Sequence, residues 1–281
     1  MRELSKTFLR CLKSDFLSQI TEYVRQDHDL NLEIRESYIN VYYKGNSLLK
    51  LSEAGSLLRY KADIDPKFLE GLQVSLEFTE DTVPQFVQNI PFIKENINRR
   101  GARSLELEYE QLIIRANNLE SRNNTEYFIV DRQYALNEGR FDLTGIYWDR
   151  DKRRAGQEVP VCLMEIKFAQ NNDVREVHEQ LARYYEAIKN KAADIASEME
   201  TTFKQKLDLK LYDQSTERLQ AMKTLAFSRN IKSFQFILIM VDYNPNSTLL
   251  DMEKIQNLPF AKQVKIFHTG FGMWRHNVRV V

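Results

Sequence analysis

The spacing of apolar residues predicts that the chain opens with one amphipathic helix. From residue 4 to 24, apolar residues recur every three or four positions, which places them on one stripe of an α-helix. Alternating apolar and polar residues at 30–34 and a further β-type stretch at 38–43 follow, and 57–64 resembles another strand. We therefore expect an antiparallel meander, followed by a short helix bent near Pro91.

The pattern changes in the second part of the chain. Residues 102–117 contain no Gly or Pro and have an apolar face, so they predict a helix. Three stretches at 127–135, 140–148 and 159–169 predict strands, and Asn137-Glu138-Gly139 predicts a hairpin turn between the first two. This order indicates a small meander that follows a helix.

The remainder of the chain predicts more helices and two further strands. Asn171-Asn172-Asp173 is typical of a helix start, and Glu176 is placed to complete a capping box. Residues 189–229 predict two surface helices. An apolar run at 234–243 predicts a strand buried on both faces, with 264–268 as its companion. The expected fold class is α/β, with an N-terminal α+β subdomain over 1–95 and a second domain over 96–281.

Composition narrows the class of protein. The chain has 281 residues, enough for a sizeable core, and no run of eighteen apolar residues or secretory signal, so we expect a cytoplasmic protein and no membrane partner. The two cysteines are not in a CxxC pair, and Cys162 lies in an apolar run, which favours a buried free thiol. Forty basic residues balance forty acidic ones, so a polyanion would have to bind local patches such as Arg99-Arg100 with Arg103, or 150–154.

Two carboxylates and an ammonium are predicted to meet on neighbouring strands. Side chains alternate along a strand, so Glu165 and Lys167 project onto one face, and Asp142 of the preceding strand can approach Glu165 if the register allows it. Carboxylates this close repel each other unless a cation neutralises them. Oxygen ligands of this kind suit Mg²⁺ or Mn²⁺, and Lys167 would compensate charge on a phosphate. On the next helix, Gln180 and Tyr184 are four residues apart and share a face.

Other catalytic classes have little support. The four histidines lack HxxxH or Cys/His spacing, which argues against a zinc site, and the chain has neither a GxSxG nor a GxxxxGK[ST] motif.

Three segments of the chain carry a family resemblance: Gly139-Arg140-Phe141-Asp142, Glu165-Ile166-Lys167 and Gln180 to Tyr184. Together they resemble the PD-(D/E)XK nuclease superfamily, in its QxxxY branch of RecB-like and phage-type exonucleases. Phe141 stands where the name of the motif has Pro. The resemblance covers roughly residues 100 to 270 and implies a restriction-endonuclease-like core of helix, three-stranded meander, helix and buried strand.

The resemblance also implies the roles of single residues. Asp142, Glu165 and the carbonyl group of Ile166 would bind the metal, and Lys167 would assist catalysis. Family members carry an acid on the first helix of the core, where Glu106, Glu108 and Glu110 compete. Glu108 lies between Leu105 and Leu112 in the sequence, and we prefer it, with Glu110 second.

The expected function is a Mg²⁺- or Mn²⁺-dependent deoxyribonuclease, with exonuclease action favoured by the QxxxY resemblance and DNA as the partner. Two alternatives stay open. One is an endonuclease subunit of a defence or restriction assembly, and the other is a non-catalytic module that binds nucleic acid or protein and has kept the fold. A homo-oligomer or a protein partner is compatible with each of them.

Overall fold

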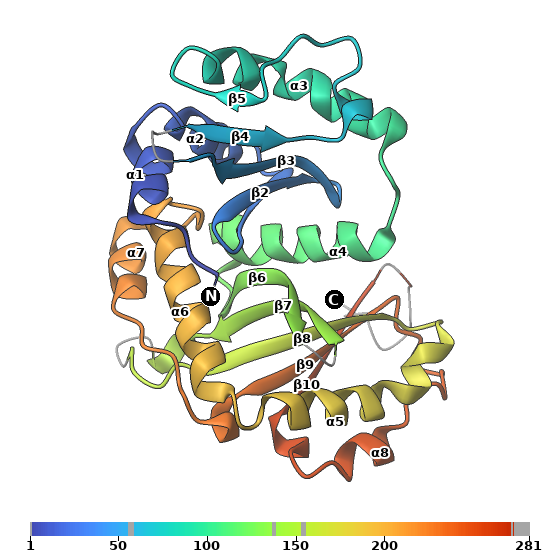
Figure 1. Cartoon of the computed structure of the whole chain (residues 1–281). Coiled ribbons are helices and arrows are strands. Elements are labelled where there is room, and N and C mark those ends of the chain that lie inside the picture. The colour runs from blue at the N-terminus through green and yellow to red at the C-terminus, as the bar shows by residue number, and fades with distance from the viewer. Residues whose placement is uncertain (1, 56–58, 137–138, 153–155, 271, 273–281) are drawn as a thin grey trace.

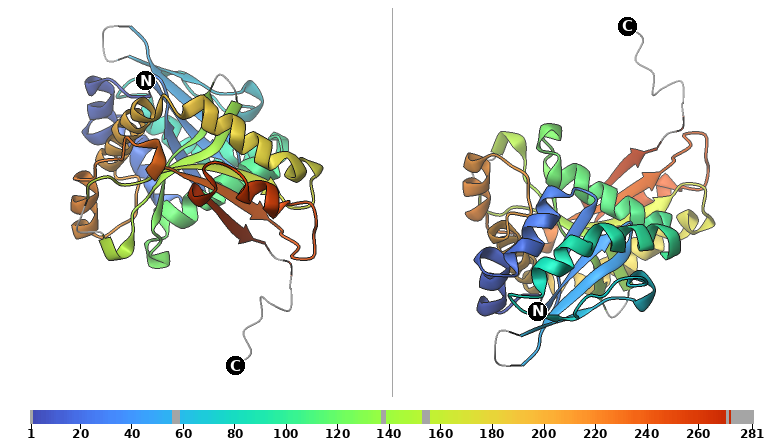
Figure 2. Two further views of the ribbon diagram at one scale, coloured as in Figure 1. Left: turned by 90° about the horizontal axis from the view of Figure 1, so that it is seen from below. Right: turned by 90° about the horizontal axis from the view of Figure 1, so that it is seen from above.

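The computed structural model describes residues 2–55, 59–136, 139–152, 156–270 and 272. They form a mixed α/β structure with two five-stranded sheets. In Figure 1, α4 runs between the two sheets, α3 lies above the first sheet, and α5 lies below the second. Figure 2 gives the same arrangement from below and from above. None of the helices in the described residues combines the length and apolar character needed to cross a membrane.

The first sheet is antiparallel throughout, in the order β1-β2-β3-β4-β5. Its core is formed by apolar residues from the sheet and from three helices, and it includes Leu209 and Leu211 from the second half of the chain. The elements of this part are α1 (Lys6–Ser14), α2 (Ser18–Gln26), β1 (Leu30–Ile34), β2 (Tyr38–Tyr43), β3 (Asn46–Glu53), β4 (Tyr60–Asp63), β5 (Glu77–Phe78) and α3 (Val83–Arg100).

The first sheet and its helices differ from the sequence prediction in three places. The single opening helix is two helices, because the chain turns after Ser14 and both helices pack into the same core. Strand β3 is absent from the sequence prediction and lies between the two strands expected at 38–43 and 57–64. The helix with Pro91 is eighteen residues long, and its Ile97 belongs to the first core, so the helix runs past the expected boundary at residue 95 and ends at Arg100.

The second sheet is mixed, in the order β10-β9-β8-β7-β6. Strands β6, β7 and β8 form the predicted antiparallel meander, and β8, β9 and β10 are parallel, as expected for the buried run and its companion. The elements are α4 (Leu105–Ile114), β6 (Tyr127–Leu136), β7 (Gly139–Tyr147), β8 (Val161–Phe168), α5 (Val177–Ile188), α6 (Ala192–Asp208), α7 (Thr216–Lys223), β9 (Gln235–Val241), α8 (Met252–Gln256) and β10 (Val264–Thr269).

Two apolar layers hold the second sheet. One face, with Val161 and Leu163, packs against α5 and α6, while the opposite face, with Met164 and Ile166, packs toward α4. Positions along β8 therefore alternate between the two layers, as predicted. The strand that carries the candidate chemistry is thus fixed on both faces, which is what a site with defined geometry requires.

Smaller expectations have mixed outcomes. Cys11 and Cys162 are both buried and free, as expected. The predicted capping box before α5 is not formed, because residues 172–176 form a 3₁₀ turn and the Asn171 side chain makes no capping hydrogen bond. Part of the predicted turn at 137–139 and part of the basic segment 150–154 lie outside the described residues.

Candidate metal centre

Asp142 lies near the start of β7, directly across from β8. Leu143 pairs with Met164 in the antiparallel ladder, so the next position along this register puts Asp142 opposite Glu165. The backbone N–H of Ile166 donates to Asp142 Oδ2 at 2.7 Å. The Asp142 carboxylate, which is 5% exposed, is therefore held against the backbone of the predicted Glu165-Ile166-Lys167 triplet.

Glu165 and Lys167 form an ion pair at this end of β8. Lys167 Nζ lies 3.0 Å from Glu165 Oε1 and 3.1 Å from Asp173 Oδ2. An ammonium group has three N–H donors, so within the described residues one remains after these two contacts. The Lys167 ammonium therefore lies beside the Glu165 carboxylate, as predicted, and can donate one further hydrogen bond.

Gln180 and Tyr184 connect α5 to both strands. Gln180 Nε2 donates to Glu165 Oε1 at 2.6 Å and to the Tyr184 hydroxyl at 2.8 Å. That hydroxyl donates in turn to the carbonyl oxygen of Arg140, two residues before Asp142, at 2.9 Å. The spacing of four residues, predicted to put Gln180 and Tyr184 on one helix face, thus produces a continuous chain of hydrogen bonds from β7 to β8.

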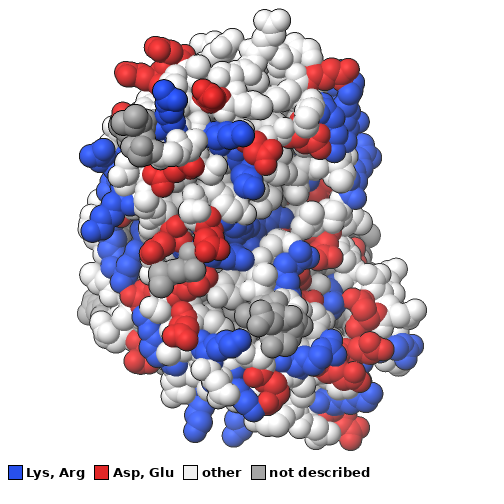
Figure 3. Space-filling view, in the orientation of Figure 1, with Lys and Arg blue, Asp and Glu red and all other residues white. Residues whose placement is uncertain are grey.

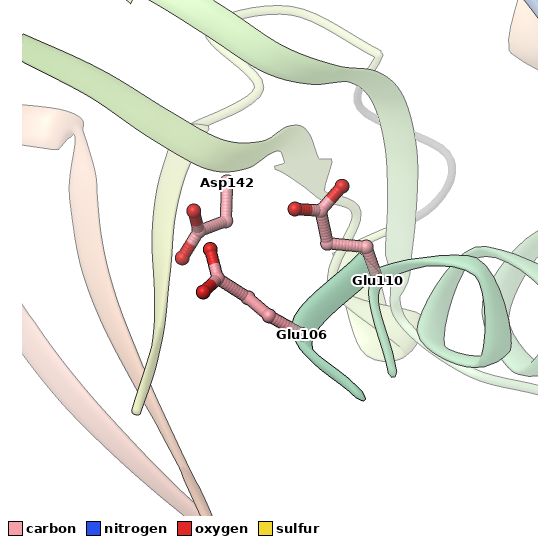
Figure 4. A group of neighbouring side chains, drawn as sticks. All are labelled: Glu106, Glu110 and Asp142. Carbon is pink, nitrogen blue, oxygen red and sulfur yellow. The ribbon is translucent and has the colours of Figure 1, made fainter. Parts of the chain in front are cut away.

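Helix α4 brings two further carboxylates to Asp142. Ligand oxygens of Glu106, Glu110 and Asp142 lie within 4.8 Å of one another, and Figure 4 shows the three carboxylates pointing toward a common space. Glu106 and Glu110 are four residues apart, so they lie one above the other on the same face of the helix. Glu165 stands beside this group of three and not within it.

The preference for Glu108 is corrected by this arrangement. It depended on Leu105 and Leu112 marking the buried face of the helix, but their side chains are 66% and 54% exposed. Glu108 instead lines a separate surface cavity with Lys44 and Arg103. Two residues along a helix rotate a side chain by about 200°, so Glu108 cannot share a face with Glu106 and Glu110.

Burial disfavours the charged forms of the carboxylic acids at the site, so each of them binds a proton or another cation more readily. Burial and the nearby Glu165 carboxylate raise the pKa of Asp142 to about 8. Burial also raises the pKa of Glu165 and of Glu110, although Lys167 and Arg132 respectively oppose the effect. Burial by itself would lower the pKa of Lys167, but the Glu165 and Asp173 carboxylates together outweigh it, and the pKa is raised. The carboxylates therefore favour the uptake of positive charge.

One oxygen atom at this site has no partner. Glu165 Oε2 is buried and accepts no hydrogen bond within the described residues. A buried carboxylate oxygen without a donor is costly, and a bound cation would satisfy it. Carboxylate oxygens are the ligands that Mg²⁺ and Mn²⁺ prefer. The residues present therefore fit a divalent ion of this class.

Two contributors to the site do not follow from the sequence prediction. Glu106 is one of three competing glutamates there and is not the preferred one, although its spacing of four from Glu110 is a usable signal. Arg132 gives no signal, because nothing in the sequence of β6 shows that a guanidinium will be buried at 1% exposure beside Glu110.

The surface near the start of α4 is basic. Figure 3 shows Lys and Arg side chains gathered along the edge of the upper half of the molecule where α3 ends, and α3 carries Arg99 and Arg100 in its last turn. Both residues, and Arg103 in the connection to α4, are exposed. This group comes just before Glu106 in the chain.

Comparison with known proteins gives no relative. No family model, no curated protein and no solved structure matches this chain.

Proposed function

We propose that the protein is a Mg²⁺- or Mn²⁺-dependent deoxyribonuclease that hydrolyses phosphodiester bonds, with exonuclease action. The observation that carries the proposal is the meeting of the Asp142 carboxylate with two acids from α4 and with the Glu165–Lys167 pair. An acidic group of this density, next to a lysine with a remaining donor, suits a substrate whose phosphate is itself anionic and arrives with a cation.

The order of elements supports the proposed family. The chain contains helix α4, the meander β6 to β8, helix α5 and strand β9 in the order that the PD-(D/E)XK resemblance implies, with α6 and α7 between α5 and β9. The proposal is supported by Asp142 on β7, the triplet 165–167 on β8 and the pair Gln180 and Tyr184 on α5, which lie on strands and a helix as the QxxxY resemblance implies. The restriction-endonuclease-like assignment rests on this agreement.

Each residue has a role that follows from its contacts. Asp142 and Glu165 would hold the ion with Glu106 or Glu110, and the carbonyl group of Ile166 is the further ligand that the resemblance implies. The ion would supply a bound water of lowered pKa and neutralise charge on the phosphate. Lys167 would donate its remaining N–H to the phosphate, where a compact cation stabilises added negative charge. Gln180 orients Glu165, and Tyr184 orients Gln180.

The nucleic acid would reach this site along the basic edge where α3 ends. Arg99 and Arg100 pair with Glu95 and Glu70 on the surface, and such exposed pairs are weak enough to exchange for phosphate contacts. Since the whole chain has no net charge, this local group is the feature that favours a polyanionic substrate.

A cleavage assay tests the proposal. Purified full-length protein is incubated with linear and with covalently closed circular DNA, in Mn²⁺ or in EDTA. We expect metal-dependent digestion of linear DNA alone, and loss of at least about a hundredfold in rate for Asp142→Asn, Glu165→Gln and Lys167→Gln.

The other outcomes separate the alternatives. Cleavage of circular DNA would identify an endonuclease. DNA binding without cleavage, unchanged by Glu165→Gln, would support a non-catalytic module. Metal-dependent cutting that survives all three substitutions would remove the proposed site.

A further inference from the structure

The N-terminal part of the chain, whose role the sequence does not reveal, reaches the acidic group through one buried arginine. Arg132 of β6 donates from Nε to Glu110 Oε2 at 2.8 Å, and its Nη2 lies 2.7 Å from the same oxygen. Arg132 Nη2 also donates to the carbonyl oxygen of Leu107, one turn earlier in α4. Arg132 is 1% exposed and Glu110 is 0% exposed. This contact therefore fixes a carboxylate that is one of the three around the candidate metal position.

The first sheet holds Arg132 from the other side. The guanidinium carbon of Arg132 lies 4.7 Å from the centre of the Tyr42 ring, which belongs to β2. An aromatic face attracts a cation, and the attraction is larger when water is excluded. Arg132 Nη1 is buried and donates no hydrogen bond within the described residues, so no such bond positions that end of the guanidinium. The Tyr42 ring is thus the part of the first sheet that sets the position of this guanidinium.

The neighbouring residues of β6 are held in the same way. Asp131 forms ion pairs with Arg2 and Arg35, and Arg2 also donates to the carbonyl oxygen of Gln133 at 3.2 Å. Gln133 has a φ of 56°, a left-handed conformation that is unfavourable for this residue type. Its side chain donates to Glu110 Oε1. Residues of the first 42 positions thus stabilise a strained segment whose two side chains, at 132 and 133, hold both oxygens of Glu110.

We infer that the N-terminal part completes the metal centre: Tyr42 and Arg132 are positioning residues that orient the Glu110 carboxylate for the divalent ion. The inference rests on the proposed function, because it assigns a role within the same site. Arg132 is 1% exposed and the Tyr42 ring lies against it, so the role assigned to both is positioning and not contact with the substrate. Their effect passes through Glu110, so removing them weakens metal binding before it changes DNA binding.

The test is the affinity of the full chain for Mn²⁺, measured by calorimetry after removal of metal with EDTA. The principal variant is Tyr42→Leu, because it leaves both buried charges in place, whereas Arg132→Gln would leave Glu110 buried without its cation and endanger folding. Tyr42→Phe keeps the ring, and Arg132→Lys keeps the charge. Tyr38→Leu is the matched control, since Tyr38 lies on the same strand and its ring contacts Lys50, whereas the Tyr42 ring contacts Arg132.

We expect Tyr42→Leu to raise the Kd for Mn²⁺ about tenfold, and Glu110→Gln to raise it as well. In Tyr42→Phe and Tyr38→Leu, the Kd should stay within about twofold of the wild-type value. At saturating Mn²⁺, kcat should recover and KM for DNA should be unchanged, which a general loss of structure would not produce. Circular dichroism and thermal melts establish that each variant is folded at the temperature of the titration.

Each of three results would overturn the inference. If Tyr42→Leu and Arg132→Lys bind Mn²⁺ like the wild type while Glu110→Gln does not, the inference is overturned and the proposed function stands. If Tyr38→Leu weakens binding as much as Tyr42→Leu, the effect is not specific and the inference is again overturned. If the wild type binds no Mn²⁺, the inference and the proposed function both fail.

Discussion

The side-chain amide of Gln180 donates to Glu165 Oε1 at 2.6 Å, and this contact joins helix α5 to the strand that carries the acidic residue. Lys167 contacts the same oxygen, so Oε1 is held by two donors while Oε2 has none in the described part of the chain. The carboxylate is therefore oriented with one oxygen toward the protein and the other available for a cation.

Loss of Gln180 should reduce activity through Glu165. In Gln180→Leu the carboxylate keeps only Lys167, so its orientation is no longer fixed, and we expect a decrease of about 10- to 100-fold in kcat. Tyr184→Phe removes one hydroxyl that bridges Gln180 and the Arg140 carbonyl, and we expect a smaller decrease together with a loss of about 1 kcal/mol in stability. Steady-state cleavage rates and urea denaturation measure the two effects. Equal activity in Gln180→Leu and the wild type would contradict the assigned role.

The stability of the metal-free protein should depend on the charge of Asp142. Its pKa is raised from the usual value to about 8, so the folded state binds this proton more tightly than the unfolded state does. Stability is therefore lost as the pH rises from about 4 to about 8, and the loss is complete above pH 8. The Asn side chain of Asp142→Asn does not titrate, so this variant avoids the loss. In EDTA at pH 8.5, its melting temperature should be higher than that of the wild type by at least about 2–4 °C, and this difference in melting temperature should become smaller toward pH 5.

Addition of Mn²⁺ at pH 8.5 should raise the melting temperature of the wild type above that of Asp142→Asn. Binding to the folded state stabilises the wild type, while the variant has lost a ligand and gains less. Melting temperatures by differential scanning fluorimetry, with and without Mn²⁺, provide both comparisons. A gap in EDTA that does not change with pH would contradict the account of Asp142.

The three glutamates of α4 should behave differently. Glu106→Gln and Glu110→Gln each remove a carboxylate from the group around Asp142, so both should weaken Mn²⁺ binding by about tenfold or more. Glu108→Gln is the matched control, because it changes the same residue type on the other side of the same helix. Calorimetric titration measures the affinity of the three variants for Mn²⁺. Weaker binding in Glu108→Gln alone would show that the wrong face of the helix has been assigned to the metal site.

Gly139 should tolerate no side chain. A Cβ atom there would lie 2.7 Å from Tyr184 Cε1, and the backbone has a φ of +152°. Gly139→Ala must displace the Tyr184 ring and with it Gln180, so we expect a loss of about 1–3 kcal/mol in stability and reduced cleavage. In Gly71→Ala the φ of +79° brings strain without any contact within 4 Å. This control should lose stability and keep its activity, and an active Gly139→Ala would contradict the role of the Tyr184 contact.

Much of the second sheet could be predicted from the sequence, because its signals are local. Strands β6 to β8 alternate or run apolar between clear turns, and β9 is apolar enough to require burial on both faces. The spacing of four between Gln180 and Tyr184 is set by the helix itself. These features do not depend on knowing which other element each one packs against.

The features that the sequence does not predict, such as the metal-ligand face of α4 and the break after Ser14, depend on tertiary packing. Helix α4 lies between the two sheets. On its other side, the Gln111 side chain donates to the carbonyl oxygens of Asp29, in the turn just before β1, and of Tyr42 in β2. Both sides of the helix are therefore in contact with protein, and the apolar positions do not single out the face that carries the metal ligands. The break after Ser14 has a similar origin, since the apolar repeat continues through it and only the shared core shows that the chain turns.

The most direct test of the central claim is the anomalous difference density of crystals grown or soaked with Mn²⁺. We predict a peak within coordination distance, about 2–2.6 Å, of Asp142 oxygens and of at least one of Glu106, Glu110 and Glu165. A protein with well-ordered side chains at these four positions and no peak among them, at a Mn²⁺ concentration that supports cleavage, would contradict the claim.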